Sequence, residues 1–547
     1  MCRHGARWLA VPPGEKDHPS EHVRTAHVCA TTLDFLAAVE PDLASQRQRS
    51  WKHCQWLRLA LDYRLPDPVR CNRGGRLLKP GLIATGLVVL LLYLWPISGR
   101  REIRVRWFVD IPVASPWSAT TNTNRMEKPT TWTASRATGL KRLADFVPRA
   151  GADYRKWRNH DLGPDRRGNV SGLSPYISHR LIREREVTAA VLGRHSFRQA
   201  EKFLQEVCWR TYWKGWLEMR PGVWCRYRST VTARLDAMAG DARLEDGFAA
   251  ATAGRTGLEC FDAWVNELVT TGYLHNHARM WFASIWIFTL RLPWQLGADF
   301  FYRHLLDGDP ASNTLSWRWV AGLQTQGKHY LARPANIAKY SGGRFAPATG
   351  LTAQAAPIES MHVDEPEPLN WPARPAGKGS YGLLLMDHDL HPESLGIGQV
   401  DALAGCAIVD ARSPLPVSAI VRDFAGAALT DALDRGRACF DLATSAVSRL
   451  PGPEEVVEWA AGNRLDTVIC AYAPVGPARE CLDRLEQRLQ ATGIGMWRIT
   501  RPWDRSAWPH ATHGFFRFRK QIPALLEANS DLFAQEPELP TRQAGSP

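Results

Sequence analysis

The stretch that decides the fold runs from Thr256 to Gly322 and reads TGLECFDAWVNELVTTGYLHNHARMWFASIWIFTLRLPWQLGADFFYRHLLDGDPASNTLSWRWVAG. Its apolar residues recur at intervals of three and four, which is the spacing of one face of an α-helix. Two polar segments, 275–280 and 307–313, interrupt the apolar residues. Buried carboxylates, arginines and amides need partners, because an unpaired buried polar group is costly. The stretch predicts buried helices that enclose either a satisfied polar core or a binding site.

Composition narrows the class of protein. A chain of 547 residues with 45% hydrophobic residues has the length for two or three domains with sizeable cores. The formal net charge of +13 favours an anionic partner, with nucleic acid first and an anionic membrane surface second. The 11 cysteines form no C-x-x-C pair and no metal-ligand spacing. They are typical of reduced thiols in a cytoplasmic protein, and no metal site is expected.

Residues 1–125 lack the clear apolar periodicity of the rest of the chain. An apolar run, 81–97, is flanked by arginines and a lysine and is nearly long enough to span a bilayer. A membrane anchor, a buried helix and an extension translated from an upstream start are the three alternatives. The extension is favoured, because the segment that starts at Met126 suits a natural beginning. Membrane association through 81–97 is therefore not expected.

The two polar segments of the central stretch carry a family resemblance. The stretch starts with Thr-Gly, continues through HNHARM at 275–280, and ends with DGDPASNTLSWRW at 307–319. It resembles the flavin-binding helical domain of the photolyase and cryptochrome family, with its patterns W-M-H-N-R-x-R-M and D-G-D-x-A-x-N-x-x-x-W-x-W. The resemblance implies a mainly α-helical FAD-binding domain over 126–345.

The segment 139–177 resembles the entry to the family's flavin site, which has a Tyr, an Arg-rich turn and T-S-x-L-S-P-Y. The resemblance places Tyr154, Ser171, Leu173 and Ser174 among the cofactor-binding residues. Hydroxyl and backbone N–H donors before a helix can hold a diphosphate. Val170 stands where the family usually has Thr, which removes one hydroxyl donor. An ordinary serine cap followed by a helical proline is the structural alternative.

The segment 200–219 places Glu206, Trp209 and Arg210 at helical spacing on one side. The matching E-x-x-W-R of the family brings the carboxylate and indole to the substrate cavity and the arginine toward the cofactor phosphates. An indole can stack on unpaired bases, and a carboxylate can accept hydrogen bonds from their imide edges. An amphipathic helix with an ion pair remains the alternative.

The resemblance also assigns roles to the flavin side of the central stretch. Arg279 is expected to pair with Asp307 across the flavin ring, where a fixed positive charge stabilises a reduced anionic flavin. Asp309 is expected at the isoalloxazine edge, and Asn313 opposite the reactive ring nitrogen. Asparagine at this last position is the pattern of repair enzymes, whereas plant-type cryptochromes carry Asp.

The substrate side indicates the type of lesion. Asn276 would help to hold a pyrimidine dimer, Met280 would pack against it, and Trp319 would line the cavity. Family members that repair (6-4) photoproducts carry His where Asn276 and Met280 stand, so this chain resembles the cyclobutane-dimer enzymes. His275 and His277 are satisfied core residues or, alternatively, acid–base groups.

Trp317 and Trp294 match the first two indoles of the family's electron-transfer chain. The third indole has no counterpart at 239–243, which reads AGDAR. Trp216, Trp264, Trp281, Trp286 and Tyr273 are the candidate substitutes. Each of these rings is equally consistent with core packing, because large aromatic side chains dominate cores.

The remaining chain predicts a linker over 346–378, an α/β domain over 379–527 and a polar tail over 528–547. Short apolar runs alternate with helical patterns in the α/β region, which favours a parallel, Rossmann-like sheet, although no G-x-G-x-x-G is present. This region resembles the antenna domain that normally precedes the flavin domain. Whether it binds a pterin, folate or deazaflavin pigment stays open. The acidic run 363–368 is expected to be solvated.

The sequence therefore predicts light-driven DNA repair, in which reduced FAD passes an electron to a cyclobutane pyrimidine dimer. The expected partner is UV-damaged DNA, bound by a monomer without an obligate protein partner. The alternatives are a cryptochrome-like blue-light sensor and repair of (6-4) photoproducts.

Overall fold

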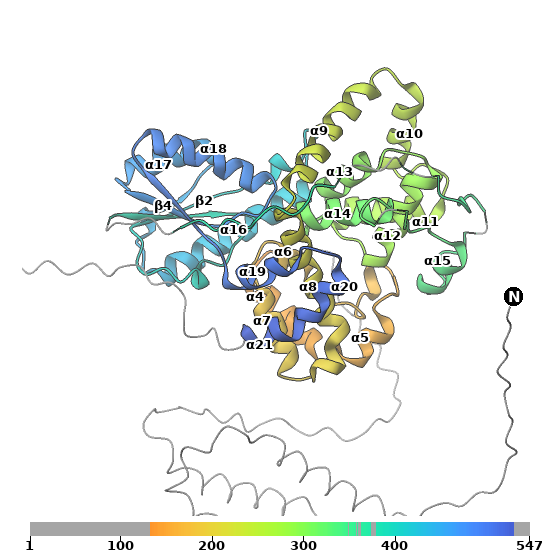
Figure 1. Ribbon diagram of the computed structural model, residues 1–547, viewed down its shortest axis with the longest axis horizontal. Coiled ribbons are helices and arrows are strands. Elements are labelled where there is room, and N and C mark those ends of the chain that lie inside the picture. Colours follow the sequence, from red (N-terminus) through yellow and green to blue (C-terminus); the bar gives the residue numbers. More distant parts are fainter. Residues whose placement is uncertain are drawn as a thin grey trace, which may run out of the picture. The chain divides into compact units, whose positions relative to one another are not determined.

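The computed structural model describes residues 132–325, 327–347, 349–356, 358, 363–373 and 379–529 (Figure 1). All of them belong to one compact unit, Thr121–Pro547. The apolar run 81–97, Met126 and nearly all of the predicted tail lie outside the described residues. Among the helices that are described, none is long and apolar enough to cross a membrane.

The first part of the described chain is built of helices, as the sequence predicts. Their bounds are α4 (Arg136–Phe146), α5 (Ala152–Trp157), α6 (Ser174–Ser178), α7 (Glu184–Leu192), α8 (Phe197–Glu218), α9 (Pro221–Met238), α10 (Ala242–Thr252), α11 (Glu259–Thr271), α12 (Asn276–Ser284), α13 (Trp294–His304), α14 (Pro310–Val320) and α15 (Pro334–Tyr340). A π-helical turn, Ile285–Thr289, continues α12.

Local chemistry sets the ends of the helices that matter most. Ser196 and Gln199 form a capping box at the start of α8. Asp309 caps α14 by accepting a hydrogen bond from the backbone N–H of Ser312, and Pro310 occupies the first helical position. Gly272 ends α11 in the left-handed region, with φ of 66°.

A five-stranded parallel sheet follows the helices, and its strand order is β3-β2-β1-β4-β5. This order is that of a doubly wound sheet. The strands are β1 (Tyr381–Met386), β2 (Ala402–Cys406), β3 (Val447–Arg449), β4 (Thr467–Ala471) and β5 (Gly495–Ile499). The prediction that the chain combines a helical part with a parallel sheet is confirmed.

The two faces of the sheet belong to two cores. Leu384 and Met386 pack with α17 (Val456–Gly462) and α18 (Pro477–Ala491). Leu383 and Leu385, which point the opposite way, belong to the core shared with α16 (Ala419–Cys439) and the helical part. Figure 1 shows α17 and α18 on one side of the strands and α16 on the other. Both faces are covered, as parallel sheets require.

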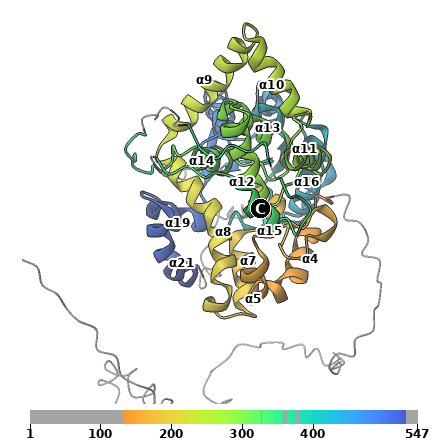
Figure 2. The same cartoon turned by 90° about the vertical axis from the view of Figure 1, so that its right-hand side faces the viewer.

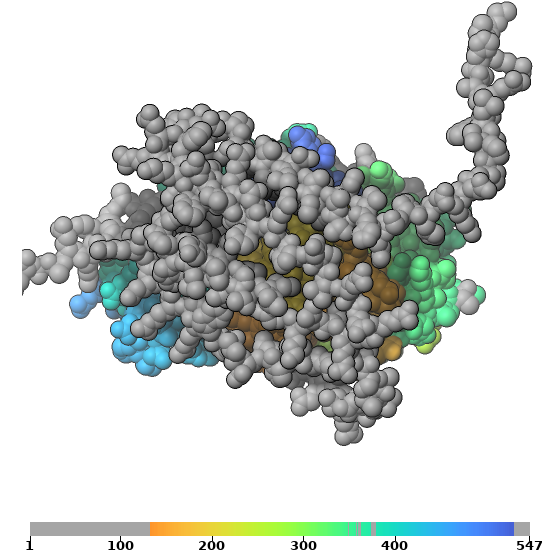
Figure 3. Space-filling model, turned by 90° about the horizontal axis from the view of Figure 1, so that it is seen from below, coloured from red at the N-terminus to blue at the C-terminus, as the bar shows by residue number. Residues whose placement is uncertain are grey.

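After β5 the chain returns to the helical part through α19 (Pro502–Ala507), α20 (Phe515–Phe518) and α21 (Ile522–Ala528), all of which contact α8. Figure 2 shows α19 and α21 beside α8, and Figure 3 gives the same unit in space-filling form from below. The indole of Trp503 donates a hydrogen bond of 3.0 Å to the hydroxyl of Thr211 on α8. Residues 502–528 therefore pack as part of the helical core rather than around the sheet.

Buried ion pairs join the two parts. Arg180 lies 2.6 Å from Asp504 and 3.2 Å from Asp389, and Asp389 lies 2.6 Å from Arg501. Burial alone would raise the pKa of Asp389, but the Arg501 and Arg180 guanidiniums outweigh it and hold the pKa below its usual range. Because each buried charge has a partner of opposite sign, removing one of them would leave another uncompensated.

The acidic run 363–368 agrees with its prediction over residues 365–368, which are exposed. Asp364 forms an ion pair of 2.8 Å with Arg226 on α9, and the backbone N–H of Glu367 donates a hydrogen bond to the carbonyl oxygen of Met219. These two contacts attach the run to α8 and α9, while the side chains of residues 365–368 stay exposed.

Candidate active site

A cavity of about 500 Å³ opens between α5, α6, α8, α12 and α14. Every residue predicted to bind cofactor lines it, and so does every predicted catalytic residue apart from Trp294. These residues are Tyr154, Ser171, Leu173, Ser174, Glu206, Trp209, Arg210, Asn276, Arg279, Met280, Asp307, Asp309, Asn313, Trp317 and Trp319. Segments that are distant in sequence thus converge on one concave site, although the roles of the individual residues stay predictions.

Arg279 and Asp307 form the predicted pair. Arg279 Nη2 lies 2.9 Å from Asp307 Oδ2, and Arg279 Nε donates to the carbonyl oxygen of Leu274. Burial alone would raise the pKa of Asp307, but the Arg279 and Arg210 guanidiniums outweigh it and keep the pKa below its usual value. Asp307 Oδ1 is buried and has no hydrogen-bond partner among the described residues. It is an acceptor ready for an N–H or O–H group of a bound molecule.

Asp309 has a partner that the sequence analysis missed. Lys214 Nζ lies 3.5 Å from Asp309 Oδ2, and both side chains are buried. Burial raises the pKa of Asp309, but Lys214 and Arg210 oppose this effect and the pKa is lowered overall. Lys214 follows Arg210 by four residues, about one turn of α8, so both side chains lie on the same face of the helix. This spacing was the sequence signal that could have identified Lys214 as a residue of the site.

Glu206 also has an unforeseen partner. Arg158, just beyond α5, lies 2.5 Å from Glu206 Oε1 and lines the same cavity. Burial raises the pKa of Glu206, and the Arg158 charge opposes the rise without cancelling it. Arg158 follows Tyr154 by four residues within the Arg-rich turn, which is the sequence signal that was available for it.

Trp209 is held by a ring from the far end of the chain. Phe515 of α20 stacks on it, with centroids 3.6 Å apart and planes at 12°. Trp213 packs against Trp209 at 5.2 Å. Offset or stacked aromatic contacts of this kind fix the plane of an indole. No local sequence signal links Phe515 to Trp209.

The amide of Asn313 is oriented by the backbone. Its Nδ2 donates a hydrogen bond of 2.7 Å to the carbonyl oxygen of Ala298. One amide donor is thereby used within the protein, and the carbonyl oxygen and the second N–H are left for a ligand. Asn276 is exposed at the first position of α12, and Met280 lies one turn further along the same wall.

The two histidines beside Asn276 do not line the cavity. His275 caps α12 through its Nδ1, which accepts from the backbone N–H of His277, and His277 stacks between Trp281 and Tyr340. Burial lowers the pKa of each to about 4. Both are therefore neutral near pH 7, and the geometry favours the core interpretation over the acid–base one.

Trp294 lies away from the cavity lining and is 4% exposed. Its ring stacks on Tyr227 at 5.8 Å, and Tyr227 packs on Trp224 at 5.4 Å. Trp317 makes an edge contact with Trp286 at 6.3 Å. Of the five rings considered for the missing third member, Trp286 is the one in ring contact with Trp317. Tyr227 and Trp224 were missed because they lie on α9, outside the family-like segments.

Comparison with known proteins shows which protein family the residues around this site resemble. A family model described as the FAD binding domain of DNA photolyase matches residues 203–345. The deoxyribodipyrimidine photo-lyase of Vibrio cholerae is 27% identical over 272 residues, which is 47% of this chain and 54% of the relative. That of a Synechococcus strain is 30% identical over 260 residues, which is 46% of this chain and 51% of the relative. The chain thus spans about half the length of the curated relatives it matches.

Two solved structures complete the comparison. A class III photolyase from Agrobacterium tumefaciens is 27% identical, with a TM-score of 0.32, and 39% of this chain and 43% of that chain are covered. A cryptochrome from Synechocystis is 23% identical, with a TM-score of 0.29, and 38% and 43% are covered.

Residues 203–345 of the helical part therefore match the FAD binding domain of DNA photolyase. More particularly, the resemblance of this chain to the photolyase and cryptochrome family is confirmed, and FAD is the cofactor of the domain.

The cavity fits this cofactor. Arg210 and Arg279 supply positive charge for a diphosphate or an anionic ring, Ser171 and Ser174 supply hydroxyl groups, and the free oxygen of Asp307 supplies an acceptor. Among the described residues no cluster of His, Cys, Asp or Glu has the arrangement of a metal site.

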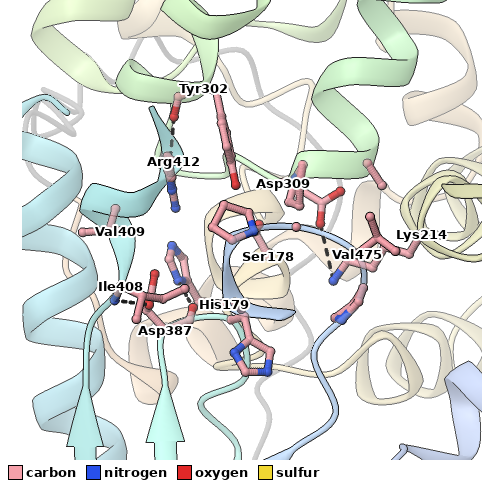
Figure 4. Close-up of a pocket in the computed structure, with 18 residues that line it drawn as sticks. Ser178, His179, Lys214, Tyr302, Asp309, Asp387, Ile408, Val409, Arg412 and Val475 are labelled. Carbon is pink, nitrogen blue, oxygen red and sulfur yellow. Dashed lines mark hydrogen bonds and ion pairs between the residues drawn. The ribbon is translucent and has the colours of Figure 1, made fainter. Parts of the chain in front are cut away.

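A second cavity lies at the carboxyl ends of β1, β2 and β4, where doubly wound sheets bind ligands. Its volume is about 60 Å³, which is room for a few water molecules. Figure 4 shows Lys214 and Asp309 facing each other on one side of it, with Arg412 and Tyr302 on another. Pro310 of α14 and Gly476 both line it and lie close together, since a Cβ on Gly476 would lie 2.6 Å from the Pro310 ring. A pterin, folate or deazaflavin ring does not fit there.

Proposed function

We propose that this protein is a light-driven DNA repair enzyme that splits cyclobutane pyrimidine dimers. The observation that carries the proposal is the convergence of two sets of side chains on one cavity. One set, around Arg279, Asp307 and Asn313, suits a flavin. The other set, Glu206 and Trp209 on α8 with Asn276 and Met280 on α12, suits a pair of bases turned out of DNA.

Bound and reduced FAD supplies light absorption and the electron that opens the cyclobutane ring. The protein's own part is geometry and electrostatics. Trp209, held flat by Phe515, offers a stacking surface for the dimer. Glu206, held by Arg158, offers an acceptor to the imide N–H groups. Arg279 would supply a positive charge to an anionic flavin, and its pairing with Asp307 holds the guanidinium in place.

The choice of lesion rests on α12. Asn276 and Met280 line the cavity, whereas His275 is buried, His277 is half-buried between Trp281 and Tyr340, and both are neutral near pH 7. A proton donor for (6-4) chemistry is therefore missing from the described cavity wall at this helix. This arrangement favours cyclobutane dimers, for which electron transfer alone suffices.

The test combines spectroscopy with repair. The purified full-length protein is expected to show flavin bands and, under reducing conditions and blue light, to remove dimers from a thymine-dimer oligonucleotide. A (6-4) oligonucleotide is expected to remain unchanged. Flavin bands without repair of either lesion would favour the sensor, repair of the (6-4) lesion alone would overturn the choice of substrate, and absence of flavin would leave only a shared fold.

Glu206→Gln and Asn276→Ala separate the substrate side from the cofactor side. Each variant is expected to retain flavin and to lower dimer repair by about 10- to 100-fold, since a hydrogen bond to a charged or buried group contributes about 1.5–3 kcal/mol. Leu192→Ala, at an exposed position on α7, is the matched control. Unchanged repair in both variants would refute the assignment of the cavity wall.

A further inference from the structure

Tyr273 is a buried tyrosine whose hydroxyl group the fold leaves unused. The residue is 7% exposed and lines the large cavity. Its hydrogen bonds with the hydroxyl of Thr271 use the backbone N–H and carbonyl oxygen, so among the described residues the phenol has no partner. The buried phenols of Tyr176 and Tyr212, in contrast, each donate to a backbone carbonyl oxygen. Because buried phenols normally find a partner, an unused one beside a cavity indicates a bound molecule.

The Tyr273 ring is tied to the turn 170–174, which lines the same cavity. The guanidinium of Arg167, three residues before the turn, lies 4.6 Å from the centre of the ring. The indole of Trp132 packs on the same ring at 5.3 Å and would lie 3.5 Å from a Cβ built on Gly172. Two side chains thus bridge the phenol and the turn, and both features belong to one part of the cavity wall.

The turn itself is short of one hydroxyl group. Ser171 and Ser174 each carry one, but Val170, which lines the cavity beside them, stands at the Thr of the pattern T-S-x-L-S-P-Y. Tyr273 stands at the Trp of the pattern W-M-H-N-R-x-R-M, so a phenol takes the place of an indole. The cavity wall has therefore lost a hydroxyl group at position 170 and gained one at position 273.

The charges around Tyr273 favour an anionic acceptor. The guanidiniums of Arg167 and Arg279 lie 4.6 and 5.4 Å from the ring, and they pair with Glu267 and Asp307, the two carboxylates nearby. Burial raises the pKa of the phenol and the two arginines oppose the rise only in part, so the phenol keeps its proton near pH 7. It is therefore a donor, and hydrogen bonds to ionised acceptors are the strong ones.

We propose that the phenol of Tyr273 donates a hydrogen bond to the diphosphate of FAD and replaces the hydroxyl donor that Val170 lacks. The donors for this group then come from two segments that are far apart in sequence, the turn 170–174 and the connection between α11 and α12. The inference concerns the cofactor alone. It does not depend on which lesion the protein repairs, because it uses no residue of the substrate side.

The first test measures FAD dissociation from the full-length holoprotein through the fluorescence of the released flavin. Tyr273→Phe keeps the ring and its arginine contacts and removes only the hydroxyl group. It is expected to weaken FAD binding about 10- to 100-fold, the range for a lost hydrogen bond to a charged group. Tyr340→Phe, which removes a phenol outside the cavity lining, is the matched control and should keep the wild-type affinity.

Val170→Thr supplies the rescue, because threonine has nearly the shape of valine and adds a hydroxyl group to the turn. In the double variant Tyr273→Phe/Val170→Thr, FAD affinity is expected to return to within a few-fold of the wild type. If both hydroxyl groups serve one acceptor, Val170→Thr improves the affinity more in the Tyr273→Phe protein than in the wild type. Independent sites would give the same gain in both.

Phosphorus NMR of the bound cofactor shows which part of FAD the phenol contacts. Tyr273→Phe is expected to shift the diphosphate signals and to leave the flavin absorption bands unchanged. Wild-type FAD affinity in Tyr273→Phe, an equal gain from Val170→Thr in both proteins, or shifted absorption bands with unshifted phosphate signals would each overturn the inference. Failure of the FAD-loaded wild-type protein to repair dimers would instead refute the proposed function, so the two failures are distinguishable.

Discussion

Gly297→Ala tests the packing that shapes the flavin cavity. Gly297 lies within α13, at the point where the indoles of Trp317 and Trp286 pack against the helix. A Cβ built on Gly297 would lie 2.6 Å from Cζ3 of Trp317 and 2.8 Å from Nε1 of Trp286. Both indoles are at most 2% exposed; Trp286 is enclosed by the core, and Trp317 can yield only toward the flavin cavity that it lines. The substitution therefore forces either the helix or the indoles to move.

Two effects of opposite sign decide the magnitude. Alanine is favoured over glycine inside a helix by about 1 kcal/mol. Overpacking of a well-filled core costs about 1–3 kcal/mol, and the upper end applies where the neighbours are rigid rings. The indole of Trp286 also donates to the carbonyl oxygen of Pro293 at 3.0 Å, a hydrogen bond that the displaced ring would strain. We expect Gly297→Ala to lower the free energy of unfolding by about 2 kcal/mol.

The assay is denaturant unfolding, followed by circular dichroism and by flavin fluorescence on the same samples. Because Trp317 lines the cavity, the bound flavin should also show a shifted absorption band and a reduced content. Gly462→Ala is the control, since Gly462 is helical in α17 and has no atom within 4 Å of its would-be Cβ. It should be neutral or stabilising. A Gly297→Ala protein as stable as the wild type with unchanged flavin would refute the placement of Trp317 against α13.

Three further predictions concern the titration of the core, the cofactor and the sheet. Burial lowers the pKa of His275 to about 4. Between pH 6.5 and pH 4 this side chain is protonated in the unfolded chain but not in the native state, so the free energy of unfolding falls as the pH drops through this range. His275→Asn, which can still cap α12, should lose about 3 kcal/mol less on that acidification, as measured by urea unfolding, and equal losses would contradict the burial. Arg279→Gln leaves Asp307 without its 2.9 Å partner and should reduce the flavin retained after dialysis, with a stability loss of about 3–5 kcal/mol; undiminished flavin would argue against the pair as a cofactor support. The absorption spectrum of the purified protein should contain no band of a pterin, folate or deazaflavin bound at the carboxyl ends of the strands, because the cavity there holds about 60 Å³, and a second chromophore bound there would contradict this geometry.

The sequence predicted those parts of the site that depend on local spacing. Glu206, Trp209 and Arg210 fall on one face of α8 because a helix repeats every 3.6 residues. Arg279 and Asp307 were predicted to pair from a resemblance, and each needed a partner once buried. The alternation of short apolar runs and helical patterns was sufficient to predict a parallel sheet.

The parts that were missed depend on tertiary contacts. Arg158 and Lys214 carry ordinary charges, and only the folded chain shows that they neutralise Glu206 and Asp309. Phe515 stacks on Trp209 although the two residues are far apart in the sequence, and no local sequence pattern predicts such a contact. The ion pair of Asp364 with Arg226 on α9 was missed because the two residues are far apart in sequence.

The return of α19–α21 to α8 has a consequence for the order of synthesis. Residues 502–528 are among the last to leave the ribosome. Until they do, the side chains that cover Trp209, Tyr212 and Thr211 are absent. The aromatic wall formed by these side chains of α8 therefore stays partly uncovered while the ribosome synthesises the sheet. A chaperone that shields this wall, or early arrival of the flavin, would protect the chain during that interval, and ribosome-bound chains that end near residue 500 should be the species most prone to aggregate.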